Sequence, residues 1–118
     1  MIPLARVDRT GTGLAFAFNM AITQDSASIN APSELGLETR ASFREAAVTL
    51  LDQLPEGGTL NVDLAATKRV DSAGLSALML IQRRAADRSQ RVVLWHPSDE
   101  FRFLLALTQL TDLFEVTS

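Results

Sequence analysis

VDSAGLSAL, residues 70–78, places an acid, a hydroxyl and a glycine directly before an apolar run. Asp and Ser are both favoured as helix N-caps, because their side-chain oxygens accept hydrogen bonds from the free N–H groups of the first turn. The stretch therefore predicts a cap at Asp71 or Ser72, followed by a helix over residues 75–88. A cap needs only one of the two residues, so the other is expected to be exposed at a strand-to-helix junction.

Strand-like and helix-like segments alternate before this stretch. Large apolar residues occupy every second position from Leu14 to Ile22, and the run at 27–31 can return beside them as an antiparallel strand. Residues 38–54 follow the period of an amphipathic helix, which Pro55 and two glycines end. TLNVDL, residues 59–64, is again strand-like.

The same alternation continues to the C-terminus. Residues 89–90 break the central helix, and RVVLW at 91–95 predicts a short buried strand. The Ser-Asp pair at 98–99 supplies N-cap candidates for a third helix through 101–110. LFEV at 113–116 is expected to close the chain as a last strand.

The resulting order is strand, strand, helix, strand, helix, strand, helix, strand. This order predicts an α/β fold with a mixed sheet of about five strands and three or more helices packed against it. A length of 118 residues fits a single domain over 1–118.

Composition excludes several classes of function. Lys+Arg of 11 against Asp+Glu of 14 gives a net charge of -3 with no basic stripe, so nucleic-acid binding is not expected. The absence of cysteine rules out disulfides and thiolate metal sites, and it favours a cytoplasmic protein. The start of the chain lacks a signal-peptide pattern, and residues 13–22 supply only about half of the ~20 apolar residues of a membrane helix, so no direct membrane insertion is expected.

Catalytic groups are scarce. His96 is the only histidine and precedes Pro97, which places it in a solvated loop, and one histidine cannot make a two-histidine metal site. VDSAG is not the GxSxG nucleophile motif. We therefore predict no enzyme, no catalytic residue and no metal. A small hydrolase using Ser72 with His96 is kept as an alternative, since it requires only that the two side chains approach within about 3 Å.

A phosphate on Ser72 would have a specific physical effect. It would meet the positive end of the helix dipole, so the fold would tolerate it. A partner docking on that surface would instead meet about -1.5 to -2 new charges. Modification would then abolish an interface without unfolding the domain, whereas the simpler interpretation makes the residue a helix cap.

The helices after this site carry more apolar residues than one buried stripe needs. Two interpretations stay open: a broad buried contact with a loose rim, or a partner groove between the helices at 75–88 and 101–110. The residues concerned are Leu75, Ala77, Leu78, Met79, Leu80 and Ile81 in the first helix, and Phe101, Phe103, Leu104, Leu105, Leu107 and Leu110 in the second.

VDLAATKRVDSAGLSALM, residues 62–79, closely resembles the central motif of STAS domains, the fold shared by bacterial anti-sigma-factor antagonists and the tails of anion transporters. The family pattern is an apolar strand ending in Asp-Leu, a short loop, then Asp-Ser/Thr-x-Gly and an apolar helix. Here Asp63 and Leu64 match its first part and residues 71–75 its second. The similarity covers about residues 27–116 and implies a STAS-like sheet.

The resemblance also implies a function, that of a non-enzymatic switch protein in transcription regulation that needs no cofactor. In antagonists of this type, an anti-sigma factor that is also a serine kinase phosphorylates the serine of the motif, and a phosphatase resets it. Carried over by position, the phosphoacceptor is Ser72. The partner-binding residues are then expected to be Asp71, Ala73, Gly74, Leu75 and Leu78. A monomer or a weak homodimer would serve this role.

Two positions depart from the family pattern. Ala73 stands where many antagonists carry a second hydroxyl, and residues 33–36 (Ser-Glu-Leu-Gly) stand where the family often has Gly-x-Leu-Asp. The alternative within the fold is a constitutive binding or scaffold subunit of a membrane lipid or anion transporter complex, in which Ser72 is only a helix cap.

Overall fold

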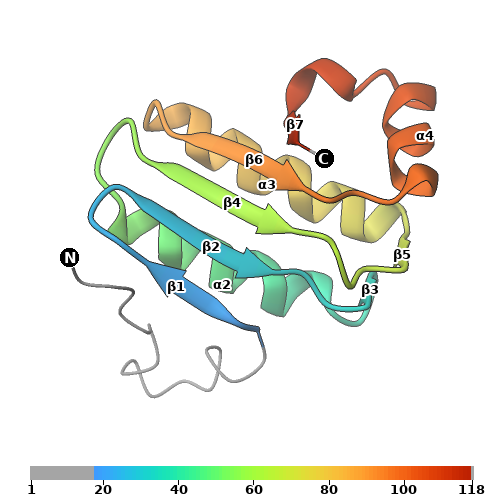
Figure 1. Cartoon of the computed structure of the whole chain (residues 1–118), viewed down its shortest axis with the longest axis horizontal. Helices are drawn as coiled ribbons and strands as arrows, with labels where there is room; N and C mark the ends of the chain where they lie inside the picture. Colours follow the sequence, from blue (N-terminus) through green and yellow to red (C-terminus); the bar gives the residue numbers. More distant parts are fainter. Residues whose placement is uncertain (1–17, 118) are drawn as a thin grey trace.

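The computed structural model describes residues 18–117 as a mixed α/β fold. The sheet forms one layer, and two helices lie side by side against one of its faces (Figure 1). Along the chain the elements are β1 (Met20–Ile22), β2 (Ser26–Asn30), β3 (Glu34–Leu35), α2 (Arg40–Gln53), β4 (Thr59–Asp63), β5 (Arg69–Val70), α3 (Ser72–Asp87), β6 (Arg91–Trp95), α4 (Asp99–Leu107), the 3₁₀ turn η2 (Thr111–Leu113) and β7 (Glu115–Thr117).

The main sheet has five strands in the order β1-β2-β4-β6-β7. Strand β1 is antiparallel to β2, as predicted for the run at 27–31, and the other neighbours are parallel. Parallel neighbours need crossovers, which α2 and α3 provide on the same face. The predicted α/β class, a mixed sheet of about five strands with three or more helices, is confirmed: residues 18–117 contain a five-stranded mixed sheet and three α-helices.

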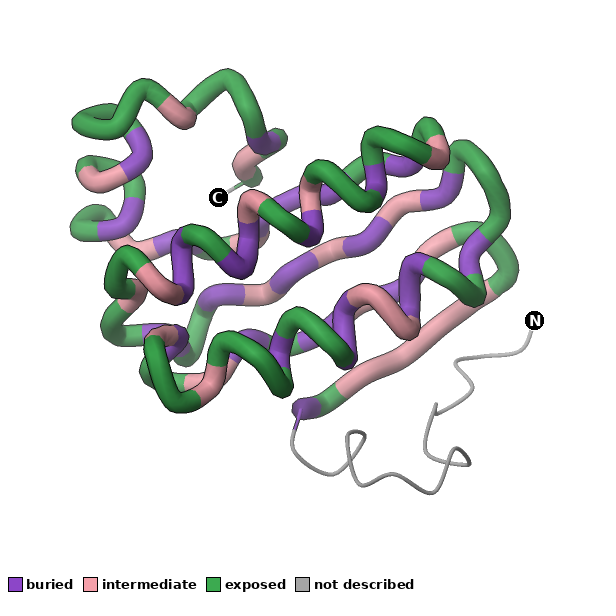
Figure 2. Tube along the Cα trace, turned by 180° about the vertical axis from the view of Figure 1, so that it is seen from behind, coloured by how far each residue is buried: buried purple, intermediate pink, exposed green. Residues whose placement is uncertain are grey.

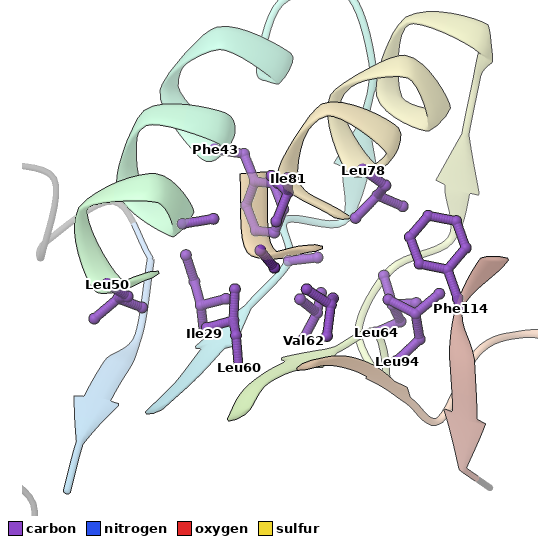
Figure 3. Close-up of a cluster of buried hydrophobic side chains, with 14 of the residues drawn as sticks. Ile29, Phe43, Leu50, Leu60, Val62, Leu64, Leu78, Ile81, Leu94 and Phe114 are labelled. Carbon is purple, nitrogen blue, oxygen red and sulfur yellow. The ribbon is translucent and has the colours of Figure 1, made fainter. Parts of the chain in front are cut away.

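The core lies between that face of the sheet and the helices α2 and α3. In β2 and β4 every second residue is buried, so Ile29, Leu60 and Val62 point at the helices. Phe43 of α2 and Leu78 of α3 meet them from the other side (Figure 3). The apolar residues that alternate along the strands and those that form a stripe on each helix therefore pack together in one core layer.

Several predicted boundaries were wrong. Helix α3 begins at Ser72 instead of Leu75, because the cap lies just before its first turn. Helix α4 ends at Leu107 instead of Leu110: Gln109 has a φ of 61°, which breaks the helix, and Leu110 N–H bonds to the Leu105 carbonyl. The last strand therefore starts later, at Glu115.

Other expectations were confirmed or fall outside the described part. Ser98 caps α4, since its Oγ accepts a hydrogen bond from Phe101 N at 3.0 Å. Of the strand expected at 14–22, residues 20–22 form β1, while residues 14–17 lie outside the described residues. Among residues 18–117, no helix combines the length and the apolar character needed to cross a membrane.

Leu78 gives a direct test of the core. We expect Leu78→Ala to lower the free energy of unfolding by about 2–5 kcal/mol, because the side chain is 0% exposed and its removal leaves a cavity. Leu107→Ala is the matched control: its side chain is 65% exposed, so the change should stay within about 0.5 kcal/mol. Urea unfolding of both variants measures the difference, and equal losses would contradict the placement of Leu78.

The edge strand β7 carries an ion pair to its neighbour. Arg91 donates from Nε to Oε2 of Glu115 at 2.9 Å and from a terminal nitrogen to Oε1. This hydrogen bond holds the pKa of Glu115 below its usual value and raises that of Arg91. Because the folded-state pKa is the lower one, the stabilisation from Glu115 is present near neutral pH and is lost as pH falls through that pKa.

We expect Arg91→Ala to raise the pKa of Glu115 toward its ordinary value. Carboxyl ¹³C shifts followed over a pH titration measure it. Arg83→Ala serves as the control, since Arg83 is exposed on α3 and has no ion pair with any described residue. A Glu115 titration that is the same in wild type and Arg91→Ala would contradict the pairing.

Candidate functional site

The VDSAGLSAL stretch, residues 70–78, is positioned by a short two-stranded ribbon, β3 with β5, beyond the end of the main sheet. Strands β3 and β5 pair in parallel, with Leu35 opposite Val70. The ribbon continues into the helix, because Asp71 N–H donates to the Leu35 carbonyl at 3.2 Å. The first turn of α3 is thereby held beside the loop that precedes α2 (Figure 1).

Asp71 is the N-cap of α3. Its backbone is extended, at φ -94° and ψ -174°, and its Oδ1 accepts a hydrogen bond from Gly74 N at 2.9 Å. Leu75 N–H donates to the Asp71 carbonyl at 2.9 Å, the first bond of the helix ladder. Of the two predicted cap candidates, the structure assigns the role to Asp71.

Two glycines allow the chain segments to approach each other here. A Cβ added at Gly74 would lie 2.0 Å from the carbonyl oxygen of Leu35, a distance no side chain can occupy. A Cβ at Gly36 would lie 2.5 Å from Oδ2 of Asp71. The glycine of the motif is therefore required by the contact between α3 and β3, and Gly36 leaves room for the capping carboxylate.

Ser72 occupies the first position inside the helix and is exposed. Its hydroxyl has no hydrogen-bond partner among residues 18–117, since the cap is made by its neighbour. It lies at the positive end of a helix of 16 residues. The hydroxyl is thus exposed, and it makes no side-chain hydrogen bond with any residue of the described range.

The other predicted partner-binding residues divide by burial. Asp71 is exposed and Ala73 is half-buried. Gly74 lies against the Leu35 carbonyl, while Leu75 and Leu78 are 7% and 0% exposed and belong to the core. The helix stripe that contains Leu75 and Leu78 faces the sheet, so their predicted role in partner binding, which stays a prediction, would require that they act through the packing of α3.

A shallow hollow flanks Asp71 on the side of the loop before α2. Thr39 holds this loop: its Oγ1 accepts from Gly36 N at 3.0 Å and donates to the Glu34 carbonyl at 2.9 Å. Leu37 projects from it with 69% of its surface exposed. The hollow is lined by Glu34, Leu35, Gly36, Leu37, Glu38, Thr39, Arg69 and Asp71. Sequence analysis missed Leu37 and Arg69, although residues 33–36 had pointed to this turn.

The structure does not form the pair that a hydrolase would require. His96 is exposed, and its Nδ1 lies 3.2 Å from Oδ1 of Asp63, at the end of β4. No hydrogen bond joins it to Ser72, whose hydroxyl has no partner in the described part of the chain. Residues 18–117 also contain no group of three or more His, Cys, Asp or Glu side chains that could hold a metal ion.

The apolar residues of α4 are divided between a buried contact and exposed positions at its edge. Helix α4 buries Phe101 and Leu105, while Phe103 and Leu107 are 66% and 65% exposed. Two hollows of the helical face lie between α2 and α3, and Leu80 lines both of them. They do not lie between the two helices of the predicted groove.

The family model described as "Mlab, STAS domain" matches residues 18–115. The chain therefore belongs to the STAS domain family. The comparison with curated proteins gave no match.

Solved structures share the fold at low sequence identity. A candidate anti-sigma factor antagonist of Thermotoga maritima, tm1081, is 17% identical with a TM-score of 0.76 over 90% of each chain. The unphosphorylated anti-sigma factor antagonist SpoIIAA is 17% identical with a TM-score of 0.67, over 86% of this chain and 87% of its own. Phosphorylated SpoIIAA of Bacillus is 18% identical with a TM-score of 0.66, over 86% and 91%.

The assignment of the helix cap to Asp71 and not to Ser72 can be tested by measuring the free energy of unfolding of variants at each position. We expect Asp71→Ala to cost about 1 kcal/mol, because Gly74 N–H loses its acceptor. Ser72→Ala should change the free energy of unfolding by less than about 0.5 kcal/mol, because no described hydrogen bond is lost. Urea unfolding measures both, and a larger loss for Ser72→Ala would identify the hydroxyl as part of the cap.

Proposed function

We propose that this chain is a non-enzymatic, phosphorylation-gated binding protein of the anti-sigma-factor-antagonist type, acting in the cytoplasm. Its partner is an anti-sigma factor that is also a serine kinase, which it binds while Ser72 is unmodified, and a phosphatase restores that state. The observation that carries this proposal is the free Ser72 hydroxyl beside a cap that Asp71 makes alone. Its structural relative SpoIIAA has been solved both with and without phosphate.

The electrostatics at Ser72 suit a switch of this kind. A phosphate there adds about -1.5 to -2 charges at the N-terminus of α3, where the unpaired N–H groups and the dipole favour an anion. Ser72 is exposed and is not part of the hydrophobic core cluster, so a phosphate there would not have to enter the core. The new charge changes the surface that a partner meets and leaves the fold intact.

The proposed partner surface is centred on Asp71, Ser72 and Ala73. Leu37 stands across the shallow hollow and offers an exposed apolar side chain at its edge. Buried Leu75 and Leu78 hold the helix against the sheet and act only by support. A partner can bury the unmodified Ser72 hydroxyl beside an apolar contact at a small cost in free energy. Burying a phosphate dianion at the same place would require removing its hydration shell, and an apolar partner surface offers no charge to compensate for that cost.

The test compares three forms of the full chain as baits in the native host. We expect wild type and Ser72→Ala to capture an ATP-dependent serine kinase and Ser72→Glu to lose it at least tenfold. Gln53→Glu is the matched control, since it adds one charge at the exposed far end of α2. The captured kinase, purified and given ATP, should phosphorylate wild type at Ser72 and leave Ser72→Ala unmodified, as mass spectrometry would show. Retention of the kinase by Ser72→Glu would contradict the gating.

A second candidate function is a constitutive subunit of a membrane lipid or anion transporter complex, with Ser72 unmodified. The match to a STAS family model favours keeping it, because the resemblance described above relates this fold to the tails of anion transporters as well as to antagonists. The same baits distinguish the two functions: in this case wild type and Ser72→Glu retain the same transport subunits.

A further inference from the structure

A second surface feature lies on the helical face and begins one turn of α3 beyond Ser72. Two adjoining shallow hollows run between α2 and α3 and share Ala41, Arg44 and Leu80. We call this the helical groove. Its remaining lining residues are Arg40, Glu45, Val48, Thr49, Ser76, Ala77 and Arg84. Figure 2 shows the two helices side by side along the front of the molecule, with exposed positions alternating along each.

The helical groove is apolar at its centre and basic at one end. Leu80 is 42% exposed, which is unusual for a leucine in the middle of a helix pair. Arg40 and Arg44 are exposed and have no ion pair with any residue in the described range 18–117. Arg84, at the other end, is already held by Asp52 at 2.8 Å. Glu45 also lines the groove and has no ion pair in the described range, so the groove carries two unpaired cations against one unpaired anion, a net positive charge on the α2 side.

The outer face of α4 has the opposite character. Phe103 and Leu107 are four residues apart and project side by side from the helix, each about two-thirds exposed. Asp99 and Glu100 stand one turn earlier, exposed and without an ion pair in the described part of the chain. We call these four residues the α4 ridge. Figures 1 and 2 agree that α4 lies at one end of the molecule, apart from α2.

We propose that the α4 ridge of one copy of this chain docks into the helical groove of another. The acidic residues of the ridge would face Arg40 and Arg44, while Phe103 and Leu107 would cover Leu80. Opposite charges around a shared apolar contact are the pattern of complementary protein surfaces. The lengths also agree: α4 has 9 residues, about 13 Å, which matches the stretch from Ala41 to Thr49 along the groove.

This contact would be heterologous, because two different surfaces of the chain meet. Each copy would then keep one free groove and one free ridge, so association continues head to tail instead of closing as a symmetric dimer. Ser72 belongs to neither surface. The proposal therefore goes beyond the proposed function and does not depend on phosphorylation.

The test is sedimentation velocity of the full chain over a concentration series. We expect the average sedimentation coefficient of wild type to rise with concentration without reaching a dimer plateau, and to rise less at high salt. Leu80→Asp, which removes the groove, and Phe103→Asp, which removes the ridge, should each stay monomeric. Mixed in equal amounts, they should form a single heterodimer, because one variant keeps a ridge and the other keeps a groove.

Charge reversal and a matched control complete the design. Arg44→Glu and Glu100→Lys should each weaken association at least tenfold, and the double variant should recover most of it. Ala86→Asp is the control: it adds the same charge at an exposed position of α3 outside both surfaces and should associate like wild type. Circular dichroism confirms that each variant is folded. A monomeric wild type, or a mixture of Leu80→Asp and Phe103→Asp that stays monomeric, would overturn the proposal.

Discussion

The contact between the first turn of α3 and the carbonyl of Leu35 is the constraint on which the site depends. Gly74 has to lack a side chain, because its Cβ would fall 2.0 Å from that oxygen. With the helix start pressed against β3, the Asp71 carboxylate reaches Gly74 N–H and closes the cap. Ser72 is then the first residue of the helix. Its side chain makes no hydrogen bond with any residue of the range 18–117.

A second constraint comes from the sheet, which packs helices against only one face. Alternation in β2 and β4 sends Ile29 and Val62 toward the helices and leaves smaller or polar residues on the other face. On that face the helical groove lies between α2 and α3, and Leu80, which lines it, is 42% exposed. The charged side chains beside it determine which partner surface it can attract.

Local patterns predicted most of the fold because each depends on neighbours in the chain. The apolar period of residues 38–54 and the alternation at 59–64 correspond to α2 and β4 within a few residues. Strands β3 and β5 could not be predicted, since each has 2 residues and exists only through its partner. The end of α4 depends on the left-handed backbone of Gln109, a conformation that no apolar pattern encodes.

The candidate site was predictable in part, for the same reason. The spacing of Asp71, Ser72 and Gly74 indicated a capped helix start, but it could not say which hydroxyl or carboxylate makes the cap. The burial of Leu78 could not be predicted, because a stripe of leucines has the same spacing whether it faces a sheet or a partner, and burial depends on distant segments. Leu37 and Arg69 join the hollow only because β3 and β5 pair across the chain.

The separation of stability from accessibility at residues 71 and 72 is what makes a charge switch physically feasible here. Were Ser72 the cap, a phosphate would remove a bond of the helix start, and modification would alter the fold together with the interface. With Asp71 in that role, a phosphate on Ser72 would leave the hydrogen bond between Gly74 N–H and the Asp71 carboxylate in place. The phosphate would then act on a partner that docks against the exposed N-terminus of α3, and the coupling between modification and binding would be electrostatic instead of conformational. A switch of this kind needs no second state of the fold.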